Sequence, residues 1–299
     1  MEQKIIQLIA CILAILSFPL GMGTYEILNL PKDARSLSLH NSASAYDGSF
    51  LRNNPASLSL AAEKTEFSYL VFPASIHSGE IQQIRKIGSR LQATKLSYIS
   101  YGTITDSESH EKTTAYEILC EMGYKQELKN IVSVGISGGY LFSSIAGYHS
   151  QLLYANIGIR SRTMRKRIGL GFSLENVGFI LSSYTDVKES IPTIFRSAMY
   201  YKPIYLPAVI SIDIIRNLDI DAVEYSGSLE VNPGKWLSLR LGCSSNRADF
   251  LTSDFSSNLL ADVSGGIGFV FNKMNLDIGF MNFSSAGYVV GFSISRNVD

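Results

Sequence analysis

The sequence predicts an all-β protein: a single antiparallel β-barrel of the bacterial outer membrane, with about fourteen strands and a plug-like segment before them. Three observations predict this class. The N-terminus is typical of an export signal. Segments of about ten residues alternate large apolar with small or polar residues. Charged residues make up only 17% of the 299-residue chain, against roughly 25% in soluble domains, so part of the surface is expected to face lipid.

Residues 1–23 are expected to be a signal peptide. Lys4 gives the segment a basic start, residues 5–18 form its apolar core, and small residues follow up to an expected cleavage site near Gly23. The apolar core is too short to favour a membrane anchor, because a spanning helix needs roughly 20 residues. Residues 8–11 match a lipoprotein cleavage box superficially, but they lie too early in the apolar core to favour lipidation.

Residues 24–63 show no sustained period and are rich in Ser, Ala and Asn. They are too many for a simple leader, so they form either a periplasmic tail or a plug that folds into the mouth of the barrel. Small residues suit close packing inside a lumen, and Asn53-Asn54-Pro55 marks a tight turn. We therefore expect a hatch segment over 24–63 and a transmembrane barrel over 64–299.

Period-two alternation covers most of the remaining chain. Within 167–176, for example, Ile168, Leu170, Phe172 and Leu174 share one face, and small or polar residues share the other. The expected strands cover approximately 64–72, 79–86, 91–104, 113–125, 130–143, 150–162, 166–176, 193–202, 207–216, 219–231, 236–244, 262–272, 273–282 and 286–296. Their number is even, as single-chain bacterial barrels require. The second and third are the weakest, which leaves twelve strands as an alternative.

A soluble β-sandwich would produce similar alternation, with its apolar face inward and its polar face in water. The export signal, the strand lengths and the many Gly and Ser residues on the polar faces favour the membrane barrel. A soluble sheet would carry more Lys, Glu and Thr at those positions. In the barrel, the large apolar side chains contact outer-membrane lipid, and every strand edge must be paired because lipid offers no hydrogen bonds.

Charged residues on the polar faces are expected to point into the lumen. Both signs occur, which favours mutual pairing over an ion filter of one sign. On a soluble sheet the same residues would be solvated surface charges. The expected lumen-facing charges are Glu117, Glu121, Arg160, Arg162, Arg167, Glu175, Asp213, Glu224, Glu230, Arg240 and Asp277.

The residues indicate no cofactor, no metal site and no enzymatic activity. The four histidines are scattered, and the Gly-rich stretches 135–139 and 265–268 lie inside expected strands, unlike a phosphate-binding loop. Equal numbers of basic and acidic residues, 26 each, argue against a nucleic-acid binder. Cys120 and Cys243 fall on apolar strand faces, so we expect free thiols that are buried or lipid-facing.

Several motifs, in order along the chain, resemble the PorV/PorQ family of outer-membrane proteins. Residues 30–39, LPKDARSLSL, resemble the family's P-x-x-A-R-S/A-x-x-L opening, and residues 54–58, NPASL, resemble its Asn-Pro-Ala-Gly-Leu with Ser in place of Gly. Residues 170–178, 191–196 and 239–242 resemble its later strand and turn motifs. Each motif is loose, but together they span nearly the whole expected mature chain.

The resemblance implies a fourteen-stranded barrel similar to the FadL long-chain fatty-acid transporters, whose N-terminal hatch also carries Asn-Pro-Ala. By analogy, a hatch motif would lie within residues 24–63, although its residues could equally serve only to fold that segment. The implied motif consists of Pro31, Ala34, Arg35, Asn54, Pro55 and Ala56.

Three functions remain open from the sequence. The leading hypothesis is a non-enzymatic PorV/PorQ-like barrel that assists protein secretion or surface attachment, as in type IX secretion, with secretion-machinery subunits or exported cargo as partners. The alternative is a FadL-like passive transporter that takes long-chain fatty acids or another hydrophobic small molecule into its lumen and releases it through a gap in the wall. The third is a soluble exported β-sandwich or a purely structural envelope protein.

Overall fold

The computed structural model describes residues 25–46, 53–58, 63–105, 112–128, 131–163, 165–185, 189–246, 262–283 and 287–298. The expected signal peptide lies outside the described residues. Within the described ranges, no helix is both long and apolar enough to cross a membrane.

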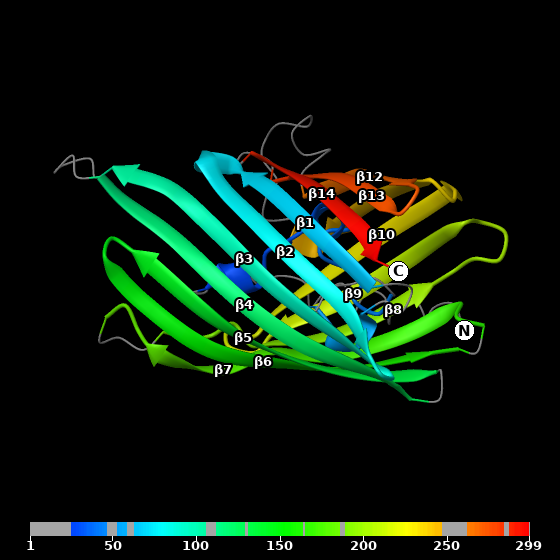
Figure 1. The fold of residues 1–299 in the computed structure, drawn as a ribbon, viewed down its shortest axis with the longest axis horizontal. Helices are drawn as coiled ribbons and strands as arrows, with labels where there is room; N and C mark the ends of the chain where they lie inside the picture. Colours follow the sequence, from blue (N-terminus) through cyan, green and yellow to red (C-terminus); the bar gives the residue numbers. More distant parts are fainter. Residues whose placement is uncertain are drawn as a thin grey trace, which may run out of the picture.

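Fourteen antiparallel strands close into one barrel, in which each strand pairs with its sequence neighbours and the first pairs with the last (Figure 1). The closed barrel confirms the expected antiparallel β-barrel and decides for fourteen strands over twelve. The strands are β1 (Glu63–Phe72), β2 (Ile76–Ile87), β3 (Arg90–Thr105), β4 (Lys112–Leu128), β5 (Val132–Ile145), β6 (Tyr148–Arg162), β7 (Ile168–Ser182), β8 (Ile194–Tyr201), β9 (Ala208–Asn217), β10 (Ala222–Gly234), β11 (Leu237–Ser244), β12 (Val263–Phe271), β13 (Met274–Asn282) and β14 (Tyr288–Val298).

The alternation seen in the sequence separates the outside of the barrel from its inside. On β7, Leu170 and Phe172 are exposed on the outer surface, whereas Gly171 and Ser173 between them are buried on the inner face. Because successive side chains of a strand point to opposite faces, one sequence pattern supplies both surfaces. Pairing β1 with β14 leaves no open strand edge, as a lipid environment requires.

The two ends of the barrel differ in their connections. The end that we call the turn rim carries the start of β1, the end of β14 and short connections such as 88–89, 235–236 and 272–273. The opposite end, the loop rim, carries the two longest connections, 183–193 and 245–262, and the 3₁₀ helix η3 (Pro73–Ser75) between β1 and β2.

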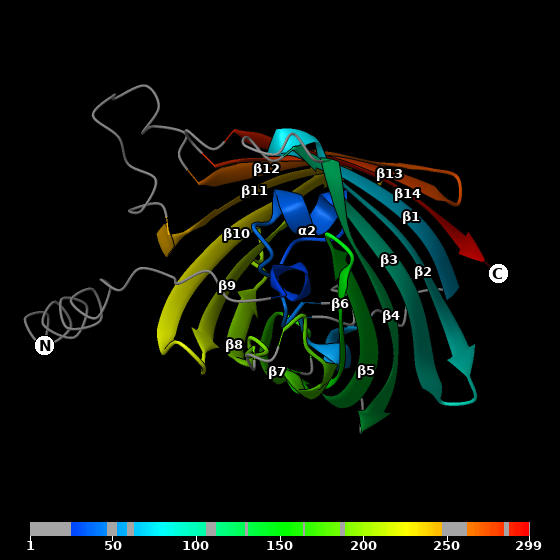
Figure 2. The same ribbon diagram turned by 90° about the vertical axis from the view of Figure 1, so that its left-hand side faces the viewer.

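Short helical elements of the N-terminal segment lie within the ring of strands (Figure 2). They are the 3₁₀ helix η1 (Glu26–Leu28), the α-helix α2 (Ala34–Ser38) and the 3₁₀ helix η2 (Pro55–Ser57). The Asp33 carboxylate caps α2 by accepting the Ser36 N–H at 2.8 Å, and it completes a capping box. Asn54 caps η2 by accepting the Ala56 N–H at 2.9 Å, and proline at the first helical position favours the turn.

Candidate functional site

Inward-facing glycines let the N-terminal segment approach the wall. A Cβ at Gly279 would overlap the Ala34 carbonyl oxygen, and a Cβ at Gly266 would overlap the Ser38 side chain, both on α2. On the other side of the lumen, a Cβ at Gly135 would overlap the backbone of η2. Gly on the polar faces of these strands therefore provides the space in which the segment packs.

Inward-facing serines supply hydrogen bonds to the backbone of the same segment. Ser133 Oγ donates to the Ala56 carbonyl at 2.9 Å, and Ser173 Oγ donates to the Asn53 carbonyl at 2.7 Å. The Ala34 N–H donates to Ser293 Oγ at 2.8 Å. Short irregular segments leave backbone groups unpaired, and buried backbone groups need partners. The Ser-rich inner faces meet this requirement.

The six residues of the expected hatch motif fall into two groups. Pro31 and Ala34 are buried where α2 meets β11–β14, and Arg35 extends from α2 to Glu230 on β10. Asn54, Pro55 and Ala56 are buried against β4–β7, with the Asn54 side-chain amide donating to backbone carbonyls of β6 and β7 at 3.4 and 3.5 Å. Two separate regions of the wall therefore hold the motif.

One ion-pair network joins α2 to the wall. Arg240 Nε lies 2.8 Å from Glu230 Oε2, and Arg240 Nη1 lies 2.5 Å from Asp277 Oδ1. Arg35 Nε adds a second cation to Glu230 at 3.1 Å. Of these four groups, Arg35 and Glu230 join the N-terminal segment to the barrel.

A second network surrounds Arg196 on β8. Its guanidinium binds the Glu175 carboxylate through two bonds of 2.9 and 3.3 Å, and it lies 3.6 Å from Asp213. Arg196 Nη1 also donates to the Asn41 carbonyl at 3.3 Å, while Asp213 accepts the Ala43 N–H at 3.0 Å. This network fixes the chain between α2 and η2 to strands β7–β9.

Most of the expected lumen-facing charges are buried on the inner face. Glu224 is half-buried and interacts electrostatically with His40. Arg167 instead lies in the connection before β7, where the turn closed by the Lys166 N–H and the Thr163 carbonyl places it outside the strands, partly exposed. The buried members are Glu117, Glu121, Arg160, Arg162, Glu175, Asp213, Glu230, Arg240 and Asp277.

Sequence reasoning missed inward charges on β3 and β4. Lys95 on β3 lies 2.8 Å from Glu121 on β4, and both side chains are fully buried. Lys125 donates to the Leu58 carbonyl at 2.5 Å, beyond η2. The signal for Lys95 was present, since Lys95 and Ser97 alternate with the outward residues Leu96 and Tyr98.

His40 and Asp262 form a further link between the N-terminal segment and the loop rim. His40 Nε2 lies 2.8 Å from Asp262 Oδ1, and Ser244 Oγ donates to the same carboxylate at 2.6 Å. Burial lowers the pKa of His40, but its hydrogen bond to Asp262 and the nearby negative charges outweigh burial and raise that pKa above its ordinary value.

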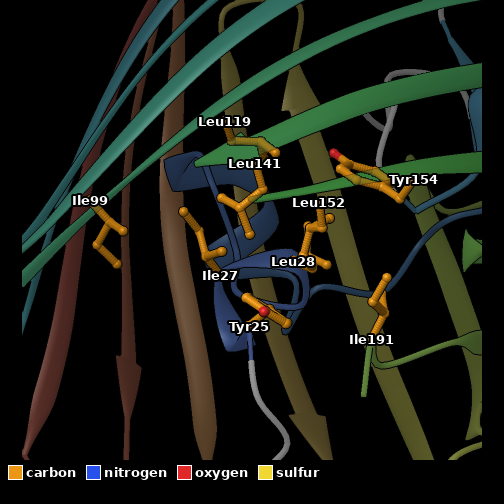
Figure 3. Close-up of a cluster of buried hydrophobic side chains, with 9 residues drawn as sticks. All are labelled: Tyr25, Ile27, Leu28, Ile99, Leu119, Leu141, Leu152, Tyr154 and Ile191. Atoms are coloured by element: carbon orange, nitrogen blue, oxygen red, sulfur yellow. The ribbon is translucent and has the colours of Figure 1, made fainter. Parts of the chain in front are cut away.

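A cluster of large apolar side chains lies inside the barrel near the loop rim (Figure 3). It joins η1 to the inner faces of β3–β6 and to the connection after β7. Ile99, Leu119, Leu141 and Leu152 have no exposed surface. The members are Tyr25, Ile27, Leu28, Ile99, Leu119, Leu141, Leu152, Tyr154 and Ile191. We call this the inner apolar cluster.

The simple rule of apolar outside and polar inside misses the inner apolar cluster. Its members break the alternation, so both faces of the strand become apolar. Leu141 lies between Tyr140 and Phe142, and Leu119 follows Ile118 directly. Runs of consecutive apolar residues within otherwise alternating strands are the sequence signal that would have found it.

Hydrogen-bonded hydroxyl groups border the inner apolar cluster on the side of the loop rim. Tyr25 OH shares a 2.5 Å hydrogen bond with Ser150 Oγ and donates to the Glu189 carboxylate. Its ring stacks on Tyr184 with centroids 6.4 Å apart. Burial raises the pKa of Tyr184 to about 12 and also raises the pKa of Tyr25, so both hydroxyls stay protonated at neutral pH and act as donors.

Beside the inner apolar cluster, two consecutive residues of the barrel wall on β5 are glycines. Gly138 faces outward beneath a shallow hollow that Met122 and Leu153 border, and Gly139 faces inward against the Tyr154 ring. Cys120 also borders the hollow. Both Cys120 and Cys243 are free cysteines on the outward face. Among the described residues, no group of His, Cys, Asp and Glu could hold a metal ion.

The chain resembles solved structures of transport proteins in fold. No family model and no curated protein matches its sequence. The toluene transporter TodX of Pseudomonas putida has a TM-score of 0.62 and 11% identity, over 89% of this chain and 97% of TodX. The toluene transporter TbuX of Ralstonia pickettii also has a TM-score of 0.62, with 9% identity over 89% of this chain and 98% of TbuX. The monoaromatic hydrocarbon channel CymD has a TM-score of 0.62 and 8% identity, over 93% of this chain and 99% of CymD.

These likenesses show that the chain shares a closed β-barrel fold with these proteins, and identities of this size show nothing beyond the fold. The similar structures are transporters and channels. None of them supports the expected role in secretion or surface attachment, and the PorV/PorQ resemblance has no counterpart among them. The alternative hypothesis, a channel for hydrophobic solutes, is the better supported of the two.

Proposed function

We propose that the protein is an outer-membrane channel that passes small hydrophobic solutes, with its N-terminal segment as the hatch. The inner apolar cluster is the observation that carries this proposal. Apolar side chains inside a polar lumen lose contact with lipid, so they serve either to pack the segment or to receive an apolar molecule. The toluene transporters and the hydrocarbon channel of the same fold favour the second role.

The loop rim is the entrance in this proposal. Outer-membrane barrels place short turns on the periplasmic side and longer loops outside the cell, which puts the inner apolar cluster near the external surface. A solute would pass Tyr25 and Tyr184 before it reached Leu119 and Leu141. Further passage requires the segment to move, because α2 and η2 both lie inside the ring of strands.

Uptake of [¹⁴C]toluene and [¹⁴C]hexadecanoate by cells that express the chain tests the proposal. The host should lack a channel of this type. We compare the wild type with Leu141→Asn in the inner apolar cluster. The matched control is Val289→Asn, since Val289 has equally little exposure and lies in a second inner cluster with Leu37 and Leu70. A heat-dependent mobility shift on gels shows that each barrel has folded.

We expect wild-type cells to take up at least one of the two solutes faster than cells without the chain. Leu141→Asn should slow this uptake about tenfold, since an unsatisfied amide in an apolar site costs about 1–3 kcal/mol. The Val289→Asn variant should keep most of the uptake. Wild-type uptake equal to that of the empty host, or equal losses in both variants, would refute the channel.

A further inference from the structure

The exposed charge of the turn rim is strongly one-sided. Eight cationic side chains are exposed there, whereas no Asp or Glu among the described residues of this rim is exposed, and Glu63 and Glu127 are only partly so. The exposed cations are Arg85, Lys86, Arg90, Arg165, Lys166, Lys235, Lys273 and Arg296. They come from the end of β2, the start of β3, the connections β6–β7, β10–β11 and β12–β13, and the end of β14. They therefore follow the rim around the barrel and do not gather in one patch.

Exposed aromatic side chains occupy the same rim. Tyr205 in the β8–β9 connection is 97% exposed, Phe271 at the end of β12 is 79% exposed, and Trp236 in the β10–β11 connection is 60% exposed. Lys235 directly precedes Trp236, and Lys273 follows Phe271 by two residues. Aromatic rings are enriched where a barrel passes from hydrocarbon to lipid headgroups. The cations of the rim therefore lie at headgroup level.

The loop rim lacks this excess of positive charge. Its exposed charged residues, among those that the structure describes, are Lys112, Arg216, Asp219 and Asp221, and Arg216 pairs with Asp221 at 2.6 Å. The two signs balance there. Because the whole chain has a formal charge of zero, the cationic turn rim reflects where charges are placed and not an excess of them.

We propose that the turn rim is a ring-shaped binding surface for anionic phospholipid headgroups. A protein partner docks on one patch, whereas a lipid annulus contacts the whole circumference, as these cations and aromatic rings do. Each basic residue near a membrane surface attracts anionic lipid, and the attraction weakens as ionic strength rises. The proposal is independent of what passes through the lumen.

The test measures which lipid stays bound to the purified full-length protein. The protein is reconstituted in bilayers of phosphatidylcholine mixed with phosphatidylglycerol, released, and analysed by native mass spectrometry. The rim variant is Lys166→Gln with Lys235→Gln. Its matched control removes two exposed cations from the loop rim, Lys112→Gln with Arg216→Gln. The heat-dependent mobility shift confirms that all three barrels are folded.

We expect the wild type and the loop-rim control to retain phosphatidylglycerol in preference to phosphatidylcholine. The rim variant should lose this preference by about fivefold or more, and added salt should reduce it in the wild type. Equal retention of the two lipids by the wild type would overturn the proposal and leave the ring to an acidic protein partner. A rim variant that retains as much phosphatidylglycerol as the control would overturn it as well.

Discussion

Arg196→Met tests how strongly the buried networks hold the lumen together. The Arg196 side chain is 3% exposed and lies between two carboxylates, Glu175 at 3% and Asp213 at 0% side-chain exposure. Methionine keeps the length and removes the charge, which leaves two buried acids without their shared cation. Removing one partner of a buried pair costs about 3–5 kcal/mol. We therefore expect the free energy of unfolding to fall by about that amount.

Arg35→Met is the matched comparison, because its loss leaves no buried acid without a cation. Glu230 keeps Arg240 at 2.8 Å, and the Arg35 side chain is 18% exposed. The expected loss is about 1 kcal/mol. Adding Glu175→Gln to Arg196→Met removes one of the two orphaned acids, so the double variant should be more stable than Arg196→Met alone.

Urea unfolding in lipid vesicles measures these differences. Trp236 is the only tryptophan of the chain and lies exposed at the turn rim, so its emission reports transfer from the membrane surface to water. An Arg196→Met variant within 1 kcal/mol of the wild type would refute the reasoning. So would a double variant that is no more stable than Arg196→Met.

Three further predictions address separate features. Gly279→Ala should cost about 1–3 kcal/mol in urea unfolding, because its Cβ would overlap α2. Gly227→Ala should cost less, because its Cβ would meet only the Ser211 carbonyl oxygen at 3.9 Å, and equal costs would contradict this. The raised pKa of His40 adds stability that is full below its ordinary pKa of about 6.5 and is lost as pH rises through the folded value, so stability should fall as pH rises above about 6.5. A His40→Gln variant with the same pH slope would disprove that origin. A spin label on Cys120 should relax faster with oxygen than with a water-soluble nickel chelate; the reverse order would place this residue in water.

The sequence was sufficient for the barrel because alternation is a local signal. Each strand shows its own two faces, so neither the partner strand nor the lumen contents need to be known. The alternation is weaker on β2 and β3, where the polar residues Gln82 and Lys95 interrupt shorter runs of apolar residues. It does not predict the inner apolar cluster. Leu141 is an apolar residue on the inner face, and its neighbours Tyr140 and Phe142 are apolar residues on the outer face. A rule based on alternation cannot predict a strand that is apolar on both faces.

The position of the N-terminal segment could not be read from its own residues. Its partners lie far away in sequence: Ala34 binds Ser293, and Asn53 binds Ser173. No local pattern encodes such contacts, so the small residues favoured a segment inside the barrel over a periplasmic tail but did not indicate which strands it contacts. The motif around Asn54-Pro55-Ala56 illustrates a related limit, since these residues cap and pack a short helix, and such a motif conveys a fold more than a function.

The pairing of β1 with β14 has a consequence for how the protein assembles. The cylinder cannot close until the first strand pairs with the last. The β1–β14 pairing, which has the longest sequence separation, therefore completes the barrel. The N-terminal segment is made before any of its partners exists, yet it ends inside the finished cylinder. Because α2 contacts both β1 and β14, it packs on both sides of the seam where the cylinder closes. The packing of the segment and the closure of the wall therefore stabilise each other.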